Sequence, residues 1–225
     1  MPPLLSIGSA VSWRFATRTP TTTIWRWISN TTGTTRRIAP SARAGRSVCW
    51  AWTDRRKMID SPDRLPFARE LTANWRRIRD EYLLVADDLR DWPEKHLYGE
   101  GWRVFGLFDF PGGEAIPRNT RRCPITSQLV ARHIPGHGAA GFSALAPGTR
   151  VEPHCGYQGN FLRCHLGLIV PEGECGLEVD GYTLRWREGA MTIFDDRNRH
   201  RAWNLTAGSR VVLLIDVPEE MAWKI

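Results

Sequence analysis

Apolar side chains recur at steps of three and four between residues 67 and 90. The repeating positions are Leu71, Trp75, Ile78, Tyr82 and Val85. This spacing places all five on one face of a helix, because an α-helix turns once every ~3.6 residues. The segment is therefore predicted to be one amphipathic helix.

Residues 91–140 break into short apolar pieces separated by proline and glycine. These punctuating positions are Pro111-Gly112-Gly113, Pro117, Pro124 and Pro135-Gly136. Both residue types favour turns and loops. We expect strands and loops that decorate a barrel in this part of the chain.

After residue 141, short strand candidates follow one another at turn-separated intervals. The clearest turn is Asp180-Gly181, which lies between Leu177-Glu178-Val179 and Tyr182-Thr183-Leu184. An Asp-Gly pair between two such runs is a strong signal of a two-residue hairpin. The pattern suits a jelly roll better than an open sheet, so the predicted fold class is mainly β with one flanking N-terminal helix.

The segment 161–170 alternates with period two. Arg163 and His165 fall on one face, and the opposite face carries Leu162, Cys164, Leu166 and Leu168. A solvated face is one explanation of the polar pair, since antiparallel sheets often have one. Gly167 and Ile169 share the polar face, however, and this favours a barrel interior. Both polar side chains are then predicted to point into one enclosed space.

The charge of the chain is concentrated at its N-terminus. The 225 residues carry a net charge of +7, but residues 1–57 contain ten of the 31 Lys and Arg and one of the 24 Asp and Glu. This leaves 21 basic and 23 acidic residues, a net charge of about −2, for residues 58–225. The charge of that domain gives no reason to expect a nucleic-acid partner. Residues 1–57 lack any sustained periodicity and are predicted to be mostly disordered. A transit-like segment, a basic nucleic-acid-binding arm and an artefactual extension upstream of Met58 remain open.

The cysteines and the apolar segments bear on location. No apolar stretch approaches the ~20 residues that span a bilayer. The five cysteines form no C-x-x-C pair, so free thiols in a reducing cytoplasm are the simplest interpretation. Zinc is disfavoured beside the histidines, because Cys155 and Cys164 lack the close spacing of structural zinc ligands.

Two histidines, His154 and His200, lie far apart in the sequence with strand-like residues on both sides of each. A non-haem Fe(II) centre usually takes two His and one carboxylate and keeps open positions. Gly156 stands where such a carboxylate is expected. For Asp195 and Asp196 we favour hydrogen bonds around the metal ligands over ligation, because the second nitrogen of a ligating His is commonly held by a carboxylate or a carbonyl. A loop histidine such as His154, taken alone, is more often a surface or hydrogen-bonding residue than a metal ligand, and His200 taken alone could lie in a solvated turn between two arginines.

Arg210 begins an almost uninterrupted apolar strand, residues 211–215, and is predicted to be at least partly enclosed. A buried guanidinium without a partner costs several kcal/mol, so it needs an anion. One candidate is a core carboxylate such as Asp216, and the other is a bound dicarboxylate. For the remaining histidines, His96, His133 and His137, no role is assigned, and Trp186 and Trp203 are expected to pack in the barrel.

The chain resembles the aspartyl/asparaginyl β-hydroxylase family over roughly residues 62–218. The motifs that carry the resemblance are Asn74-Trp75-x-x-Ile78-Arg79-x-Glu81, Cys123-Pro124-x-Thr126, Phe142-Ser143, Pro147-Gly148-Thr149, Pro153-His154-x-Gly156, Leu162-Arg163-x-His165-Leu166-Gly167-Leu168, Glu188-Gly189, Phe194-Asp195-Asp196, His200 and Arg210. The resemblance implies a double-stranded β-helix that uses Fe(II), 2-oxoglutarate and O₂. It also implies iron held by two histidines, with Gly156 where relatives of the family have Asp or Glu.

The resemblance assigns the candidate site as follows. His154 and His200 would hold the metal, and Arg210 would bind the distal carboxylate of 2-oxoglutarate with help from Ser143. Arg163 and His165 would contact 2-oxoglutarate near its metal-binding end, or the substrate. In such enzymes the metal supplies the redox chemistry, and the protein supplies orientation and electrostatics.

The substrate is less well defined by the sequence. Protein-hydroxylating members carry a further Arg before the Arg-x-His motif, and Phe161 occupies that place here. The β-carbon of an Asp- or Asn-type residue or amino acid is the first candidate, in a small molecule or a short peptide. A lipid acyl chain and a carrier-tethered amino acid are alternatives. A non-catalytic, cupin-like metal-binding module would keep the histidines but gives no reason for an enclosed Arg210.

Overall fold

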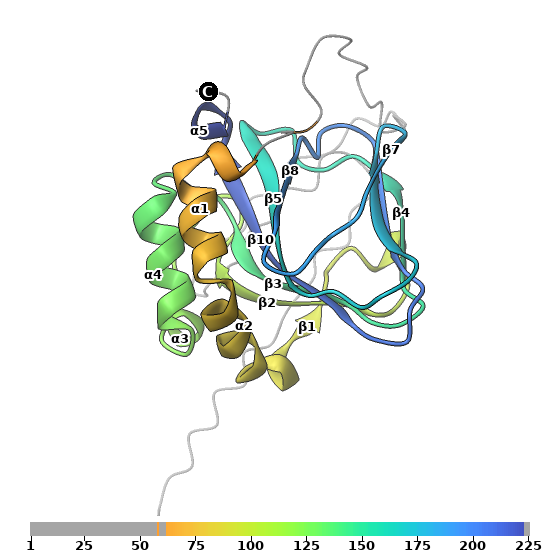
Figure 1. The fold of residues 1–225 in the computed structure, drawn as a ribbon, viewed down its shortest axis with the longest axis horizontal. Coiled ribbons are helices and arrows are strands. Elements are labelled where there is room, and N and C mark those ends of the chain that lie inside the picture. Colours follow the sequence, from red (N-terminus) through yellow and green to blue (C-terminus); the bar gives the residue numbers. More distant parts are fainter. Residues whose placement is uncertain (1–57, 59–61, 223–225) are drawn as a thin grey trace, which may run out of the picture. The chain divides into compact units, whose positions relative to one another are not determined.

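The computed structural model describes Met58 and residues 62–222, all of which belong to one compact unit of the chain. The expectations for residues 1–57 lie outside these described residues. In this described part, ten strands form two antiparallel sheets, and the chain crosses between the sheets several times after residue 145 (Figure 1). The predicted mainly β jelly roll, a double-stranded β-helix with helices beside it, is confirmed.

The larger sheet has six strands. In spatial order they are β1 (Arg90–Asp91), β2 (Trp102–Phe108), β3 (Ala140–Leu145), β10 (Arg210–Pro218), β5 (Phe161–Ile169) and β8 (Met191–Phe194). The smaller sheet has four strands, in the order β4 (Arg150–His154), β9 (His200–Asn204), β6 (Cys175–Val179) and β7 (Tyr182–Leu184).

Alternation along β5 and β10 divides the apolar residues between two cores. Leu162, Cys164, Leu166 and Leu168 of β5 face the helices, together with the odd-numbered residues 211–217 of β10. Val212 and Leu214 face the smaller sheet and pack with Phe194, Leu177 and Val179. Arg163 and His165 therefore lie on the face of β5 that is turned toward the barrel interior, as their spacing predicts.

Three helices cover the outer face of the larger sheet, α1 (Pro66–Ala73), α2 (Trp75–Leu83) and α4 (Pro124–His133), and they lie on one side of it in Figure 1. The prediction of one continuous helix over residues 67–90 is wrong. Asn74 takes φ −104° and ψ 8°, and its backbone N–H bonds to the carbonyls of Leu71 and Thr72, which ends α1. The predicted apolar stripe survives this break, because Leu71, Ile78, Tyr82 and Val85 are all buried.

Short elements complete the chain. They are η1 (Pro62–Arg64), η2 (Ala86–Asp88), η3 (Lys95–Leu97), α3 (Pro117–Thr120) and α5 (Glu219–Ala222). Helices α3 and α4 replace part of the predicted strands and loops of residues 91–140. Pro117 and Pro124 begin these helices, at the first position, where proline tolerates its missing N–H.

The N-terminus of α4 is held from α2 by a buried carboxylate. Glu81 is 6% exposed, and its two oxygens accept hydrogen bonds from the N–H groups of Ile125 and Thr126 and from the hydroxyl of Thr126, at 2.6–2.8 Å. A carboxylate at this place satisfies donors that have no partner within the helix and complements its dipole.

The hairpin predicted at Asp180-Gly181 is confirmed. Val179 pairs with Tyr182, and the two turn residues have φ values of 47° and 87°. Two consecutive positive φ values are typical of the type I′ turn, which fits the twist of the flanking strands.

No helix within the described residues is long and apolar enough to cross a membrane. Three cysteines, Cys123, Cys164 and Cys175, are buried free thiols. Cys155 is disulfide-bonded, so the expectation of free thiols is wrong for that residue.

Candidate metal centre and its surroundings

A bulge brings His154 to the inside of the barrel. Val151 of β4 pairs with Ala202 of β9, but His154 pairs with His200, so β4 contains one more residue than β9 in this stretch. Val151 and Ala202 point inward and pack together. The additional residue turns His154 to this same side, where His200 already lies.

The two imidazole rings lie side by side, with centroids 4.2 Å apart. Each Nδ1 lies within hydrogen-bond distance of a backbone carbonyl, that of Glu152 at 2.8 Å from His154 and that of Asn198 at 3.0 Å from His200. Carbonyls, rather than the carboxylates of Asp195 and Asp196, thus hold the rings. With Nδ1 as the donor, the lone pair of each Nε2 is left for a metal ion.

The surroundings of both rings disfavour the protonated form. Burial lowers the pKa of His154. Burial and then the neighbouring His154 lower the pKa of His200 to about 3. Neutral imidazole is the form that binds metal ions, so the environment favours ligation over protonation.

Gly156 leaves room for a carboxylate from the turn between β8 and β9. A Cβ at this position would lie 2.3 Å from Oδ2 of Asp196, and the Gly156 N–H donates to the Asp196 carbonyl at 2.7 Å. Asp196 is 5% exposed, and burial raises its pKa to about 6. Asp195 is engaged elsewhere, since its two oxygens accept hydrogen bonds from Arg197 at 2.6 and 2.7 Å.

Arg163 bridges two buried carboxylates. Its guanidinium contacts Asp216 at 2.7 Å and Asp196 at 3.0 Å. Burial opposes its charge, but these two carboxylates raise its pKa overall. Asp216, considered in the sequence as a partner of Arg210, therefore pairs with Arg163 instead, and Arg163 is a fixed part of the wall beside the histidines.

Arg210 is a buried cation with no carboxylate against it among the described residues. It is 3% exposed, its Nε has no hydrogen-bond partner, and a guanidinium nitrogen donates to the Ser143 carbonyl at 3.4 Å. Burial lowers its pKa to about 10, which leaves it charged at pH 7. A buried cation with an unused donor is a site for an anion.

His165 and Ser143 lie on the strands that flank β10. In the register of the sheet, His165 pairs with Leu214 and Ser143 pairs with Val212. Burial, followed by the Arg210 cation, holds the pKa of His165 well below its usual range. The four residues proposed from the sequence, Ser143, Arg163, His165 and Arg210, thus come from three adjacent strands of one sheet.

Two tryptophans at this site were given no functional role from the sequence. Trp186, expected only to pack, is 4% exposed and lies under the Arg210 guanidinium, with 4.4 Å from Cζ to the ring centroid. Its Nε1–H also donates to Nδ1 of His165 at 3.3 Å. Trp102 donates to the Ser143 hydroxyl at 3.0 Å. Only the indole contacts reveal these roles, because apolar periodicity cannot distinguish such a ring from ordinary packing.

Aromatic rings gather at the end of β5 that lies next to Arg163. The rings of Phe110 and Tyr157 meet edge to face at 4.8 Å. A Cβ on Gly159 would contact both Tyr157 and Phe161 within 3.4 Å, so those two rings are neighbours. Tyr157 is 46% exposed and follows His154 by three residues. We call Phe110, Tyr157 and Phe161 the aromatic rim.

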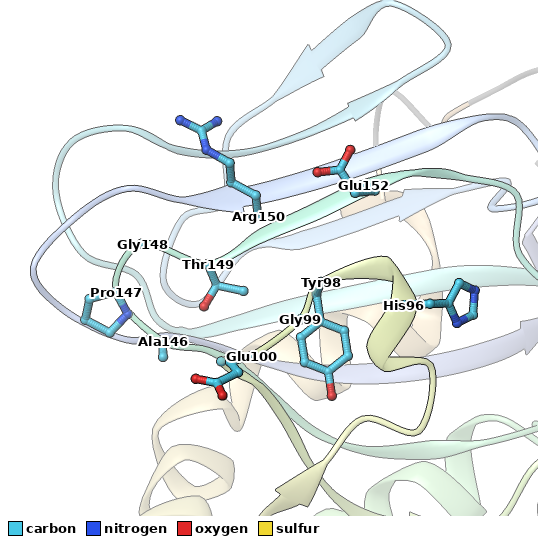
Figure 2. Close-up of a pocket in the computed structure, with 11 residues that line it drawn as sticks. His96, Tyr98, Gly99, Glu100, Ala146, Pro147, Gly148, Thr149, Arg150 and Glu152 are labelled. Carbon is cyan, nitrogen blue, oxygen red and sulfur yellow. The ribbon is translucent and has the colours of Figure 1, made fainter.

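A surface hollow of about 650 Å³ lies between η3 and the turn into β4 (Figure 2). His96 and Tyr98 line one side, and residues 146–150 and Glu152 line the other. Its lining includes neither of the paired histidines nor Arg210. The hollow is distinct from the barrel interior, and we assign it no function.

The histidine pair fits a metal ion that keeps several open positions. Among the described residues, no group of three or more His, Cys, Asp or Glu side chains is placed to hold a metal. Two imidazoles whose Nδ1 atoms are held by carbonyls suit a transition-metal ion such as Zn, Cu, Fe or Ni, and the adjacent buried cation suits an anion. The residues present therefore fit a metal centre with two protein ligands and open positions.

A known protein family matches more than half of this chain. The family described as aspartyl/asparaginyl beta-hydroxylase matches residues 72–220. The chain belongs to the aspartyl/asparaginyl β-hydroxylase family. Its family region contains every residue of the histidine pair and the Arg210 site.

Individual members of the family differ in what their names say they act on. An ornithine lipid ester-linked acyl 2-hydroxylase of Rhizobium tropici is 42% identical over 117 residues, covering 51% of this chain and 41% of that protein. The human aspartyl/asparaginyl beta-hydroxylase is 34% identical over 160 residues, covering 66% of this chain and 20% of that protein. This chain thus spans less than half the length of either relative.

A 2OG-Fe(II) oxygenase of Burkholderia pseudomallei is among the similar solved structures. It has a TM-score of 0.46 and 12% sequence identity, and the alignment covers 68% of this chain and 90% of that one.

Proposed function

We propose that this protein is an Fe(II)- and 2-oxoglutarate-dependent dioxygenase that hydroxylates an unactivated carbon. The observation that carries the proposal is the combination of two neutral, inward-facing histidines with a buried Arg210 that has no carboxylate partner in the described chain. A non-catalytic metal-binding module would need the first feature but not the second.

His154 and His200 would hold Fe(II), and Arg210 would receive the distal carboxylate of 2-oxoglutarate through its planar fork. When bound, the iron supplies the redox chemistry by which 2-oxoglutarate and O₂ yield succinate, CO₂ and an oxygen atom for the substrate. Ser143 and His165 would orient the cosubstrate. Arg163, whose charge is shared by Asp196 and Asp216, would keep the wall next to the metal rigid.

The first substrate candidate is the β-carbon of an Asp- or Asn-type residue or amino acid, presented by a small molecule or a short peptide. Membership of the family and the similarity to the human aspartyl/asparaginyl beta-hydroxylase support it.

A lipid acyl chain is the second candidate, and specific observations favour it. The Rhizobium relative with the highest identity among those named above is an acyl 2-hydroxylase. The aromatic rim is apolar, and Phe161 stands where protein-hydroxylating members are expected to carry a further Arg. The arginines nearest the rim are already paired, Arg163 with Asp196 and Asp216 and Arg197 with Asp195 and Glu219. The hydrocarbon chain of an acyl lipid fits beside these apolar rings, and among the described residues no unpaired arginine near the rim is left to bind the carboxylate of an Asp-type substrate.

Anaerobic titration with Fe(II) and 2-oxoglutarate tests the reaction class. We expect the weak visible charge-transfer band of the metal chelate in the wild-type protein, and its loss in His154→Ala and Arg210→Ala. His133→Ala and Arg201→Ala are matched controls that should keep the band. Well-folded, metal-loaded wild-type protein without a band would favour the non-catalytic module.

A competition between two substrate panels then separates the candidates. Peptides with Asp or Asn are compared with acyl lipids for succinate formation coupled to a product heavier by one oxygen atom. Phe161→Arg should lower turnover of the acyl substrate if the aromatic rim binds it. Coupled turnover of the peptides alone would identify the first candidate.

For the rest of the chain, we propose that residues 58–225 form the catalytic domain and that it works in the cytoplasm. The three buried free thiols support that location, whereas the disulfide of Cys155 does not. Nucleic acid is a partner only if residues 1–57 bind it. Salt-sensitive binding that disappears when residues 1–57 are deleted would support such a role.

A further inference from the structure

Trp186 contacts two of the polar side chains that the proposed function assigns to 2-oxoglutarate. Its ring face lies 4.4 Å from Cζ of Arg210, and its Nε1–H lies 3.3 Å from Nδ1 of His165. Arg210 and His165 come from different strands, β10 and β5. One indole therefore contacts a side chain from each strand, where both side chains point into the barrel.

The contact with His165 determines which ring nitrogen carries the proton. An indole N–H is a donor and has no acceptor capacity. Nδ1 of His165 must therefore accept, so the proton of the neutral ring is on Nε2. The ring then presents an N–H donor on the side away from Trp186, which is the group that a carboxylate or keto oxygen needs.

The contact with Arg210 places the guanidinium carbon over the indole, 4.4 Å from the ring centroid. The cation is attracted to the ring face, and a ring face offers no lone pair that would take up one of the guanidinium N–H groups. Nε of Arg210 is the buried polar atom without a hydrogen-bond partner in the described residues. The indole thus holds a cation that keeps an unused donor for an anion.

The backbone that carries Trp186 is itself held close to β5. A Cβ on Gly167 would lie 2.2 Å from the carbonyl oxygen of Arg187, and Gly189 N–H donates to the Gly167 carbonyl at 2.9 Å. Gly167 is two residues from His165 on the same face of β5. This close approach fixes the distance between Trp186 and His165.

We propose that Trp186 is a positioning residue for 2-oxoglutarate, because its indole sets both the orientation of Arg210 and the tautomer of His165. The inference rests on the proposed function for its ligand, but the two contacts are properties of the protein alone. Trp186 acts through its neighbours and needs no contact with the cosubstrate.

The first test reads the tautomer directly. Long-range ¹H–¹⁵N correlation spectra of the full-length, metal-free protein should show His165 neutral with its proton on Nε2. In Trp186→Phe, which keeps an aromatic face but loses the N–H, we expect the proton to distribute over both nitrogens. A wild-type His165 protonated on Nδ1 overturns the proposal, whether or not the protein binds 2-oxoglutarate.

The second test measures anaerobic 2-oxoglutarate binding to the Fe(II)-loaded protein by calorimetry. Trp186→Phe should weaken binding by about 10-fold, and Trp186→Leu, which also loses the aromatic face, by more, on the order of 100-fold. Pyruvate lacks the distal carboxylate, so the additional effect of Trp186→Leu should disappear with it. Trp203→Phe is the matched control, because Trp203 also lies near two arginines, Arg185 and Arg201.

The outcomes separate this proposal from the proposed function. Wild-type protein that fails to bind 2-oxoglutarate contradicts the function, while the tautomer measurement still decides the role of Trp186. Equal binding by wild type, Trp186→Phe and Trp186→Leu, with all three folded, overturns the positioning role and leaves the function standing.

Discussion

At the scale of single residues, the site depends on which groups pair with each buried arginine. Arg163 and Arg210 look alike in the sequence, since each lies on a strand of apolar residues. Arg163 is neutralised by Asp196 and Asp216, whereas Arg210 meets an indole face and a carbonyl. Arg210 is therefore the arginine whose charge is left for a ligand.

Arg210→Lys should weaken 2-oxoglutarate binding by ~10-fold or more, because an ammonium cannot reproduce two parallel N–H donors. Calorimetric titration under anaerobic conditions measures the change. Arg201→Lys, at an exposed pair with Glu178, should leave the affinity unaltered. Equal affinities for wild type and Arg210→Lys would mean that the fork geometry is not used.

Gly156→Ala should lower the free energy of unfolding by ~1–3 kcal/mol, as overpacking of a filled interior does. The new methyl group must displace the buried Asp196 carboxylate from Arg163. Urea denaturation measures the loss, with Gly112→Ala as the control because a Cβ there meets only Glu114 at 4.0 Å. A variant as stable as the control would show that Asp196 moves freely.

At the scale of elements, a contact between helices substitutes for a local cap. Helix α4 begins without a side-chain cap of its own, and Glu81 of α2 supplies the acceptors. The sequence shows Glu81 on the helix that contains the apolar stripe but cannot show which N-terminus it reaches. Tertiary contact therefore stabilises a helix whose own pattern is weak.

Glu81→Gln keeps the shape of the side chain but replaces one accepting oxygen with an amide NH₂ beside backbone donors. We expect a loss of ~1–3 kcal/mol in the free energy of unfolding, measured by urea denaturation. Glu70→Gln on the exposed side of α1 is the control and should change stability little. A loss equal to that of the control would exclude the capping role.

At the scale of the whole molecule, ligands that bind only the folded barrel should stabilise it. Fe(II) with 2-oxoglutarate at a concentration 100 times the dissociation constant should add ~2.7 kcal/mol. The melting temperature should rise with ligand concentration under anaerobic conditions, and a chelator should reverse the rise. His154→Ala should show no such rise, and an equal shift in that variant would place the metal elsewhere.

Much of this arrangement is predictable from the sequence, for reasons that are local. Period-two alternation places Arg163 and His165 inside, and Asp180-Gly181 fixes a hairpin, because both signals depend on neighbouring residues. The break at Asn74, the helix at Pro124–His133 and the roles of Trp102 and Trp186 were not predicted. The break at Asn74 is a local change of backbone angles that leaves the apolar spacing intact, whereas the other features depend on partners from distant segments, and periodicity identifies a face but not what lies opposite it.

The close packing of Asp196 against Gly156 has an evolutionary consequence. A single substitution that returned a carboxylate to position 156 would collide with the one already there, so it would arrive with a loss of stability. Removing Asp196 first would leave Arg163 with one of its two buried partners. Each order of change passes through an impaired intermediate, and this mutual dependence, or epistasis, tends to preserve a centre with two protein ligands once it has formed.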